Sequence, residues 1–155
     1  MSPTLKEDLR QRKAFTSLQQ EAFLNVLRTS SRLTDSLEDL LRPYGLSSTQ
    51  FNVLRILRGS EPDGLCRNEL RDRMLTRMPD MTRLLDRMED AGLVTRSREQ
   101  EDRRMVLTRI TVAGQALLQE LERPVVELHR KQLGRLSDEQ LRSLIDLLTL
   151  AREGA

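Results

Sequence analysis

The side chains in this sequence best able to bind or react are arginines, because histidine and cysteine are almost absent. The chain of 155 residues has one histidine and one cysteine, and only three of its 26 basic residues are lysines. The planar guanidinium of arginine binds phosphate oxygens and the edge of guanine through paired hydrogen bonds. The formal net charge is only +2, and a GC-rich genome would also favour arginine codons. The positions of the arginines must therefore decide whether they bind nucleic acid.

One charged stretch, REQEDRRMV at residues 98–106, follows the β-prone segment GLVTR and precedes the β-prone segment VLTRIT. Six of its first seven residues are charged. Segments rich in β-branched residues on both sides of a polar stretch predict a two-stranded hairpin with a charged tip. A guanidinium on such a thin tip can enter the minor groove of DNA, where the negative potential is concentrated.

Two short helical patterns precede this hairpin. The first is CRNELRDRM at residues 66–74, and the second is PDMTRLLDRMEDAGL at residues 79–93. Only residues 75–78 join them, and two short helices joined by so tight a turn indicate a helix-turn-helix. Pro79 suits the first turn of the second helix, and Gly92 suits the position just beyond its last turn.

Leucine-rich helices are predicted on both sides of this middle region. Apolar spacing predicts a long helix over residues 15–41, which ends near Pro43, and a shorter helix over residues 49–57. After the hairpin, a helix over residues 113–133 should bend at Pro124. A final helix over residues 138–152 should begin at a capping box, because Ser137 is followed three residues later by Gln140. The terminal helices carry more apolar surface than one small neighbour would hide, so we expect them to pack between two chains; packing within one chain is the alternative.

The order of these motifs resembles the winged-helix regulators of the multiple antibiotic resistance regulator (MarR) family. The resemblance rests on LSSTQFNVL at 46–54, TRLLDRMEDAGLV at 82–94, DRR at 102–104 and ITVAG at 110–114. It implies a single mainly α chain, 1–155, with a small β-wing. A winged helix-turn-helix DNA-binding region would cover residues 46–112, flanked by helical dimerisation regions over residues 5–45 and 113–153.

The resemblance and the geometry of the motif together predict which residues bind double-stranded DNA. The second helix should lie in the major groove with its N-terminal residues at the base edges. Arg83 is then the candidate for guanine and Asp80 the candidate for cytosine, while Arg77 and Thr82 would bind phosphates. Arg87 could bind a phosphate or pair with Asp86 or Asp90, and we expect the pairing. The predicted DNA-binding residues are Arg77, Pro79, Asp80, Thr82, Arg83 and Arg103.

The resemblance also assigns roles at the wing tip. Arg103 would be the residue that enters the minor groove, and Asp102 and Arg104 would brace the turn as a charge-assisted pair. Glu99 and Glu101 would repel a phosphate backbone, so we expect them to face away from the DNA.

For function, the family implies a dimeric transcriptional repressor that a small molecule releases from DNA. One helix and one wing read only a few base pairs, so a homodimer on a pseudo-palindromic operator is expected. A small aromatic or anionic effector between the dimer helices and the winged region would lower DNA affinity by favouring another separation of the recognition helices. The candidate effector-binding residues are Phe15, Phe23, Arg28, Tyr44 and Phe51, with Arg28 available for a carboxylate.

Two other functions stay open at this point. A winged-helix dimer could act through protein contacts alone, although such a protein has no need for arginine at both position 83 and position 103. Cys66 could sense oxidants, because a helix N-terminus and the neighbouring Arg67 favour a thiolate; a small buried cysteine is the simpler interpretation.

An enzyme is not expected. His129 is the only histidine, there is no glycine-rich phosphate loop, and no second cysteine or histidine stands at metal-ligand spacing. We therefore predict no catalytic residues, no metal site and no cofactor. The sequence has no apolar run near the length that spans a bilayer and no N-terminal secretion signal, so no membrane partner and a cytoplasmic location are expected.

Overall fold

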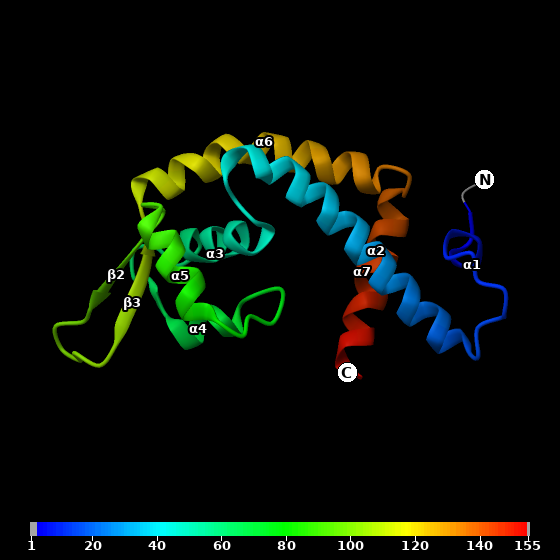
Figure 1. Cartoon of the computed structure of the whole chain (residues 1–155), viewed down its shortest axis with the longest axis horizontal. Coiled ribbons are helices and arrows are strands. Elements are labelled where there is room, and N and C mark those ends of the chain that lie inside the picture. Colours follow the sequence, from blue (N-terminus) through cyan, green and yellow to red (C-terminus); the bar gives the residue numbers. More distant parts are fainter. Residues whose placement is uncertain (1–2, 155) are drawn as a thin grey trace.

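Residues 3–154 are described in the computed structural model, which consists mainly of helices with one small antiparallel sheet (Figure 1). The predicted class, a mainly α chain with a small β-wing, is confirmed. None of the helices in this part of the chain combines the length and apolar character needed to cross a bilayer. In chain order the elements are α1 (Leu5–Asp8), α2 (Leu18–Leu41), the 3-10 helix η1 (Arg42–Tyr44), α3 (Ser48–Arg58), β1 (Leu65–Cys66), α4 (Arg67–Asp72), α5 (Met81–Asp90), β2 (Val94–Arg98), β3 (Val106–Ile110), α6 (Val112–Leu133) and α7 (Asp138–Glu153).

Side-chain caps determine where the long helices begin. Ser17 Oγ accepts a hydrogen bond from the Gln20 N–H, so α2 starts at Leu18 and the predicted start at residue 15 was too early. The predicted capping box of α7 is confirmed, because Ser137 and Gln140 each accept from the backbone N–H of the other.

Proline and glycine act in the long helices largely as the sequence indicated. Pro43 lies in η1, and Gly45 follows it with a left-handed φ of 70°, which ends the helical run before α3. Pro124 lies inside α6, and the helix continues through it as a gentle arch (Figure 1). At its far end α6 crosses α2, where Gln132 Nε2 donates to the Leu33 carbonyl at 2.9 Å.

The helices of the helix-turn-helix are shorter than the sequence suggested. The link between α4 and α5 is residues 73–80, not residues 75–78. Asp80 is the N-cap of α5, because its Oδ1 accepts from the Arg83 N–H at 3.0 Å, so Pro79 lies before the first turn rather than in it. A buried asparagine on α3 holds this longer link: Asn52 Oδ1 accepts from the Leu75 N–H at 3.0 Å.

The sheet contains one strand more than the predicted hairpin. Its order is β1-β3-β2, with both pairs antiparallel. The hairpin itself is confirmed, since β2 pairs with β3 from Val94–Ile110 to Arg98–Val106. The two-residue strand β1 was missed because it is too short to show the alternating pattern of a strand.

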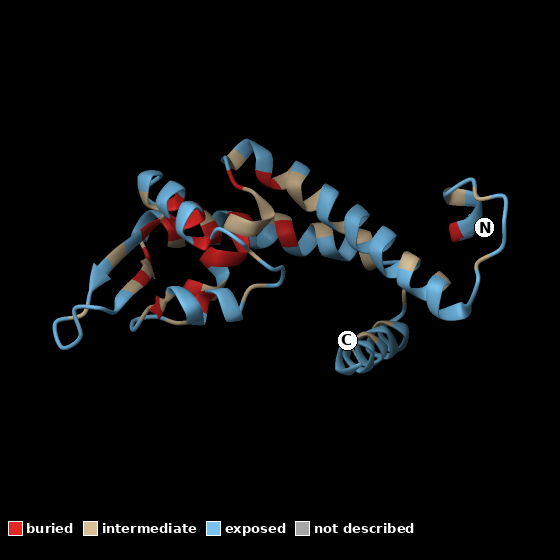
Figure 2. Cartoon of the chain, turned by 60° about the horizontal axis from the view of Figure 1, so that its bottom comes forward, coloured by how far each residue is buried: buried red, intermediate tan, exposed pale blue. Residues whose placement is uncertain are grey.

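The hydrophobic core lies in the winged half of the chain, where Figure 2 shows most of the buried residues. α3, α4, α5, the sheet and the first part of α6 all contribute to it. In the long helices at the other end, α2 buries only Leu41 among its own residues and α7 buries none. The core residues with less than 2% exposure include Val53, Leu54, Leu57, Leu70, Met88, Val94 and Leu121.

Gly114, near the start of α6, packs against the chain so closely that a side chain there would collide. A Cβ would lie 2.5 Å from the Leu93 carbonyl oxygen and 2.7 Å from Ile110 Cγ1. We expect Gly114→Ala to lower the free energy of unfolding by about 1 to 3 kcal/mol, the usual cost of overpacking, as measured by urea denaturation. Gly59→Ala is the matched control, because its Cβ would meet only ordinary contacts at 3.5 Å and beyond. Equal unfolding free energies for the two variants would contradict this expectation.

Candidate nucleic-acid interface

The outer face of α5 presents polar and charged residues to solvent. Helical spacing turns Met81, Leu84, Leu85 and Met88 into the core, which leaves the positions between them exposed. Thr82 and Arg83 lie in the first turn of α5, the end that enters the major groove in a helix-turn-helix. The exposed residues of α5 are Thr82, Arg83, Asp86, Arg87 and Asp90.

The other predicted contacts of this helix lie just before it. Arg77 and Pro79 are exposed in the link, and Asp80 stands at the boundary as the N-cap. One carboxylate oxygen of Asp80 is already bound to the helix N-terminus, so a contact between Asp80 and cytosine would have to use the other oxygen.

Three acids of this region have partners within the chain, so they do not pair with the arginines of the exposed face. Asp80 caps α5, Glu69 Oε2 accepts from the Cys66 N–H at 3.0 Å, and Asp86 Oδ1 accepts from Arg96 Nη2 at 2.6 Å. The expected pairing of Arg87 with Asp86 or Asp90 is wrong, because Arg96 reaches Asp86 from the wing and Arg87 has no ion pair with either acid among the described residues. The alternative, a phosphate contact of Arg87, stays a prediction. Within residues 3–154, no acid lies at ion-pair distance from the guanidinium groups of Arg77, Arg83, Arg87, Arg103 and Arg104. Unneutralised cations on one face are what a phosphate backbone attracts.

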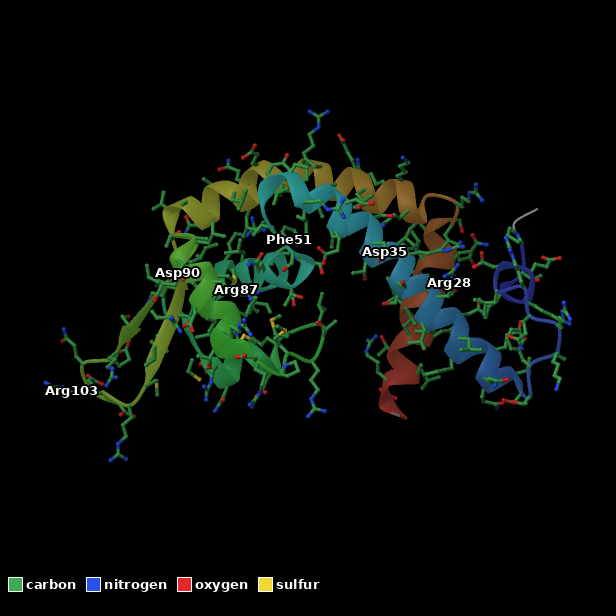
Figure 3. All side chains as sticks on the ribbon, in the orientation of Figure 1. Arg28, Asp35, Phe51, Arg87, Asp90 and Arg103 are labelled. Carbon is green, nitrogen blue, oxygen red and sulfur yellow. The ribbon has the colours of Figure 1, made fainter. Side chains whose placement is uncertain are left out.

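The wing carries Arg103 at its tip, beyond the paired strands (Figure 3). The turn below it is closed by two hydrogen bonds of Asp102, whose Oδ1 accepts from the Arg104 N–H and whose carbonyl accepts from the Met105 N–H, both at 3.0 Å. The brace therefore differs from the predicted pair of side chains, because a short aspartate readily bonds the backbone two residues on. The guanidinium of Arg104 is left available for a ligand.

Glu99 is neutralised from the opposite strand. Arg109 Nη2 lies 3.4 Å from Glu99 Oε1, while its Nη1 donates to Ser97 Oγ and its Nε donates to the Pro62 carbonyl. One acid of the charged stretch is therefore neutralised within the wing and repels a phosphate backbone less than an unpaired acid would. This partner came from a residue ten positions away, which no local pattern identified.

A groove of about 540 Å³ runs between the wing, α5 and the start of α4. Its lining includes polar and cationic side chains and also an acid and apolar side chains, among them Arg67, Asn68, Thr82, Arg96, Arg104, Asp102, Leu85, Met105 and Val106. Arg67 Nη1 donates to Thr82 Oγ1 at 3.0 Å, which orients both groups at the N-terminal end of α5. The concave shape and the cations suit a sugar-phosphate strand. The sequence analysis did not select Arg67 and Asn68, because they lie on α4 and not on the helix that was expected to enter the major groove.

Cys66 is the N-cap of α4 and is only partly buried. The pKa of Glu69 lies below its ordinary value because the backbone N–H and the side chain of Cys66 both hydrogen-bond to it. Cys66 and Glu69 thus form the cap of α4 together. A redox role of Cys66 stays a prediction.

The five candidate effector residues are spread over the chain rather than gathered around one point. Figure 3 shows Arg28 on α2 well away from Phe51 on α3. Arg28 Nε lies 3.0 Å from Asp8 Oδ2, and this hydrogen bond is the main reason why the pKa of Asp8 lies below its ordinary value. Phe23 is exposed, whereas Phe51 is buried in the core. Phe15 and Tyr44 are half-buried.

Phe51 also lines a cavity of about 210 Å³ between α3 and α6. Arg55, Arg58 and His129 line the same cavity, and the Arg55 guanidinium carbon lies 5.9 Å from the centre of the Phe51 ring. Among residues 3–154, no group of three histidine, cysteine, aspartate or glutamate side chains is placed to hold a metal ion.

Comparison with known proteins gives a consistent result. A family model described as MarR family matches residues 44–105. The transcriptional regulator PecS of Dickeya dadantii is 30% identical over 122 residues, which cover 78% of this chain and 74% of PecS. The first curated regulators that match are covered over only 57% to 65% of their own length.

Solved structures extend the comparison to the fold. A MarR transcription factor from Planctomyces limnophilus is 43% identical, with a TM-score of 0.68 over 88% of this chain and 99% of that one. A MarR variant from E. coli, solved in complex with operator DNA, is 25% identical, with a TM-score of 0.74 over 81% of this chain and 89% of that one.

Proposed function

Since this chain belongs to the MarR family of transcriptional regulators, we propose that it is a homodimeric repressor that binds a pseudo-palindromic operator. The observation that carries the proposal is the position of Arg83 and Arg103. One lies on the exposed first turn of α5 and the other at the wing tip, and neither has an ion-pair partner among the described residues. These are the two places from which a winged helix reaches the major and the minor groove. A chromosomal operator as ligand would place the protein in the cytoplasm.

A second copy of the chain is the proposed partner of the two terminal helices. Ile145, Leu147 and Leu150 on α7 are each more than 60% exposed, and Phe23 on α2 is 62% exposed. Figure 2 shows α7 projecting from the rest of the chain with almost its whole surface in solvent. Burial of apolar surface contributes about 25 cal/mol for each Å², so pairing these faces between two chains would stabilise a dimer. Two recognition helices could then occupy major grooves roughly 34 Å apart.

The proposed effector is a small aromatic anion that binds between the winged half and the long helices. The cavity between α3 and α6 offers the Phe51 ring together with the cations of Arg55 and Arg58, and the single acid in its lining is Glu122. A ligand there would bind best to one separation of the two recognition helices, and it would release DNA if that separation no longer fits the grooves. Of the five residues predicted for this role, Phe51 is the one that lines this cavity.

The proposal is tested by selecting DNA from a random-sequence library with the purified protein and measuring the affinity for the enriched duplex by fluorescence anisotropy. We expect an enriched, nearly symmetric sequence. The affinity should fall at least about a hundredfold between roughly 50 and 200 mM salt, because several phosphate contacts release counterions. If no sequence is enriched and all duplexes bind equally weakly, the repressor function is contradicted and the alternative of protein contacts is favoured.

A further inference from the structure

Arg96 on β2 connects the wing to the recognition helix. Its Nη2 lies 2.6 Å from Asp86 Oδ1 and 3.1 Å from Glu89 Oε1. Its Nε and its backbone N–H both donate to Glu89 Oε2, at 3.3 and 2.9 Å. One residue of the wing thus binds two carboxylates that lie about one turn apart on α5. The guanidinium is largely shielded, with 24% of the side chain exposed, so solvent weakens these bonds less than it weakens an open surface pair.

The two carboxylates are unfavourable residues for a DNA-binding helix. Each negative charge on α5 repels the phosphates that Arg83 and Arg87 would attract. The hydrogen bond from Arg96 holds the pKa of Glu89 below its ordinary value, so Glu89 stays charged at neutral pH. Asp86 and Glu89 therefore have a structural task that offsets their repulsion of DNA.

The position of Arg96 along the hairpin suits that task. Arg96 pairs with Thr108 in the middle of the β2–β3 ladder, so it holds the paired part of the hairpin while Arg103 and Arg104 lie beyond the last pair. Arg109 on the other face of the sheet binds Ser97 and the Pro62 carbonyl, which holds the paired strands from the opposite side. A hairpin held on both faces keeps its tip at a constant distance from α5.

We propose that Arg96 is a positioning residue for DNA binding, which fixes the wing relative to α5 through Asp86 and Glu89 so that helix and wing tip enter neighbouring grooves together. This inference rests on the proposed function. Arg96 need not contact DNA for this role. Two contact sites joined rigidly at the right distance bind as one unit, whereas a loose joint lowers the effective concentration of the second site and adds an ordering cost.

Glu89→Gln tests the proposal, because simple electrostatics and positioning predict opposite signs. The substitution removes a negative charge and frees a cation, so electrostatics alone predicts tighter DNA binding. Positioning predicts an affinity about tenfold lower for the duplex selected by the unmodified protein, measured by anisotropy. Asp86→Asn should act in the same direction. Tighter or equal binding by both variants, in chains shown to be folded by circular dichroism, would overturn the proposal.

A double-mutant cycle separates positioning from a general loss of structure. The wing-tip variant, Arg103→Ala with Arg104→Ala, should lose at least about tenfold in affinity in the unmodified background but less than about twofold in Glu89→Gln, because a misplaced wing has little left to lose. If Glu89 had a merely structural role, the wing-tip variant would lower the affinity by the same factor in both backgrounds. Glu127→Gln is the matched control: Glu127 pairs with Arg123 on α6 at 2.9 Å, away from the wing, and its loss should change neither the affinity nor the factor.

A measurement without DNA distinguishes the failure of this inference from the failure of the proposed function. Amide hydrogen exchange of β2 and β3 should be faster in Glu89→Gln than in the unmodified protein and unchanged in Glu127→Gln. If the unmodified protein selects no DNA, the proposed function fails, and the exchange rates still decide whether Glu89 holds the wing. Unchanged exchange in Glu89→Gln would overturn the positioning role whether or not DNA is bound.

Discussion

Arg83→Glu is expected to lower the affinity for the selected duplex at least about a hundredfold, because a base contact worth about 1 to 3 kcal/mol is lost and a repulsive charge is added. Arg83 lies in the first turn of α5, is exposed and has no ion-pair partner among the described residues, so the substitution leaves the core unchanged. Anisotropy measures the affinity, and sedimentation should show the same oligomeric state as for the unmodified protein.

The matched control for this prediction is Arg123→Gln. Arg123 is 88% exposed and lies on α6, which is not part of the proposed DNA surface. Its loss should therefore change the affinity less than about twofold, as for a screened surface charge. Normal binding by Arg83→Glu would show that α5 does not read the DNA. If neither the unmodified protein nor Arg83→Glu binds any of the DNA duplexes, the alternative function through protein contacts would be favoured.

The wing gives a second readout of the same surface. Arg103→Ala and Arg104→Ala should each weaken binding most on duplexes with an A·T-rich minor groove beside the half-site. The guanidinium of Arg104 is as available as that of Arg103. Asp102 accepts a hydrogen bond from the Arg104 backbone N–H and does not pair with the Arg104 side chain. The larger of the two losses identifies the guanidinium that enters the groove.

The second large effect is expected at the proposed dimer interface. Ile145→Asp combined with Leu147→Asp should convert a dimer into monomers and lower operator affinity about a thousandfold or more, since a single half-site binds little better than non-specific DNA. Both side chains are more than 60% exposed on a helix that buries none of its residues within its own chain. Light scattering after gel filtration gives the mass, and anisotropy gives the affinity.

Arg142→Asp is the matched control for the dimer. It lies on the polar face of the same helix and changes the net charge by the same amount as the double substitution, so it should leave the mass and the affinity as they are. A double variant that stays dimeric would contradict the assignment of α7 to the interface. A monomeric double variant with full DNA affinity would contradict the need for two half-sites.

The sequence was sufficient for features that depend on neighbouring residues. Apolar spacing predicted the helical segments, the capping box of Ser137 and Gln140 predicted the start of α7, and β-prone segments predicted the hairpin around residues 98–106. These patterns are readable because the period of a helix or strand and the reach of a capping side chain span only a few residues. For the same reason, the sequence could place Arg83 on the outer face of a helix and Arg103 at a tip.

The tertiary structure alone decided which side chains pair and which stay available. Arg96 binds Asp86 and Glu89, Arg109 binds Glu99, and Asn52 holds the link at Leu75. Each of these contacts joins residues 7 to 23 positions apart in the chain, so it exists only after the elements have packed. That packing also produced the strand β1, the longer link before α5 and the occupation of Arg28 by Asp8. A charged side chain chooses its partner by distance in space, and the periodicity of a single sequence carries no information about distances between elements.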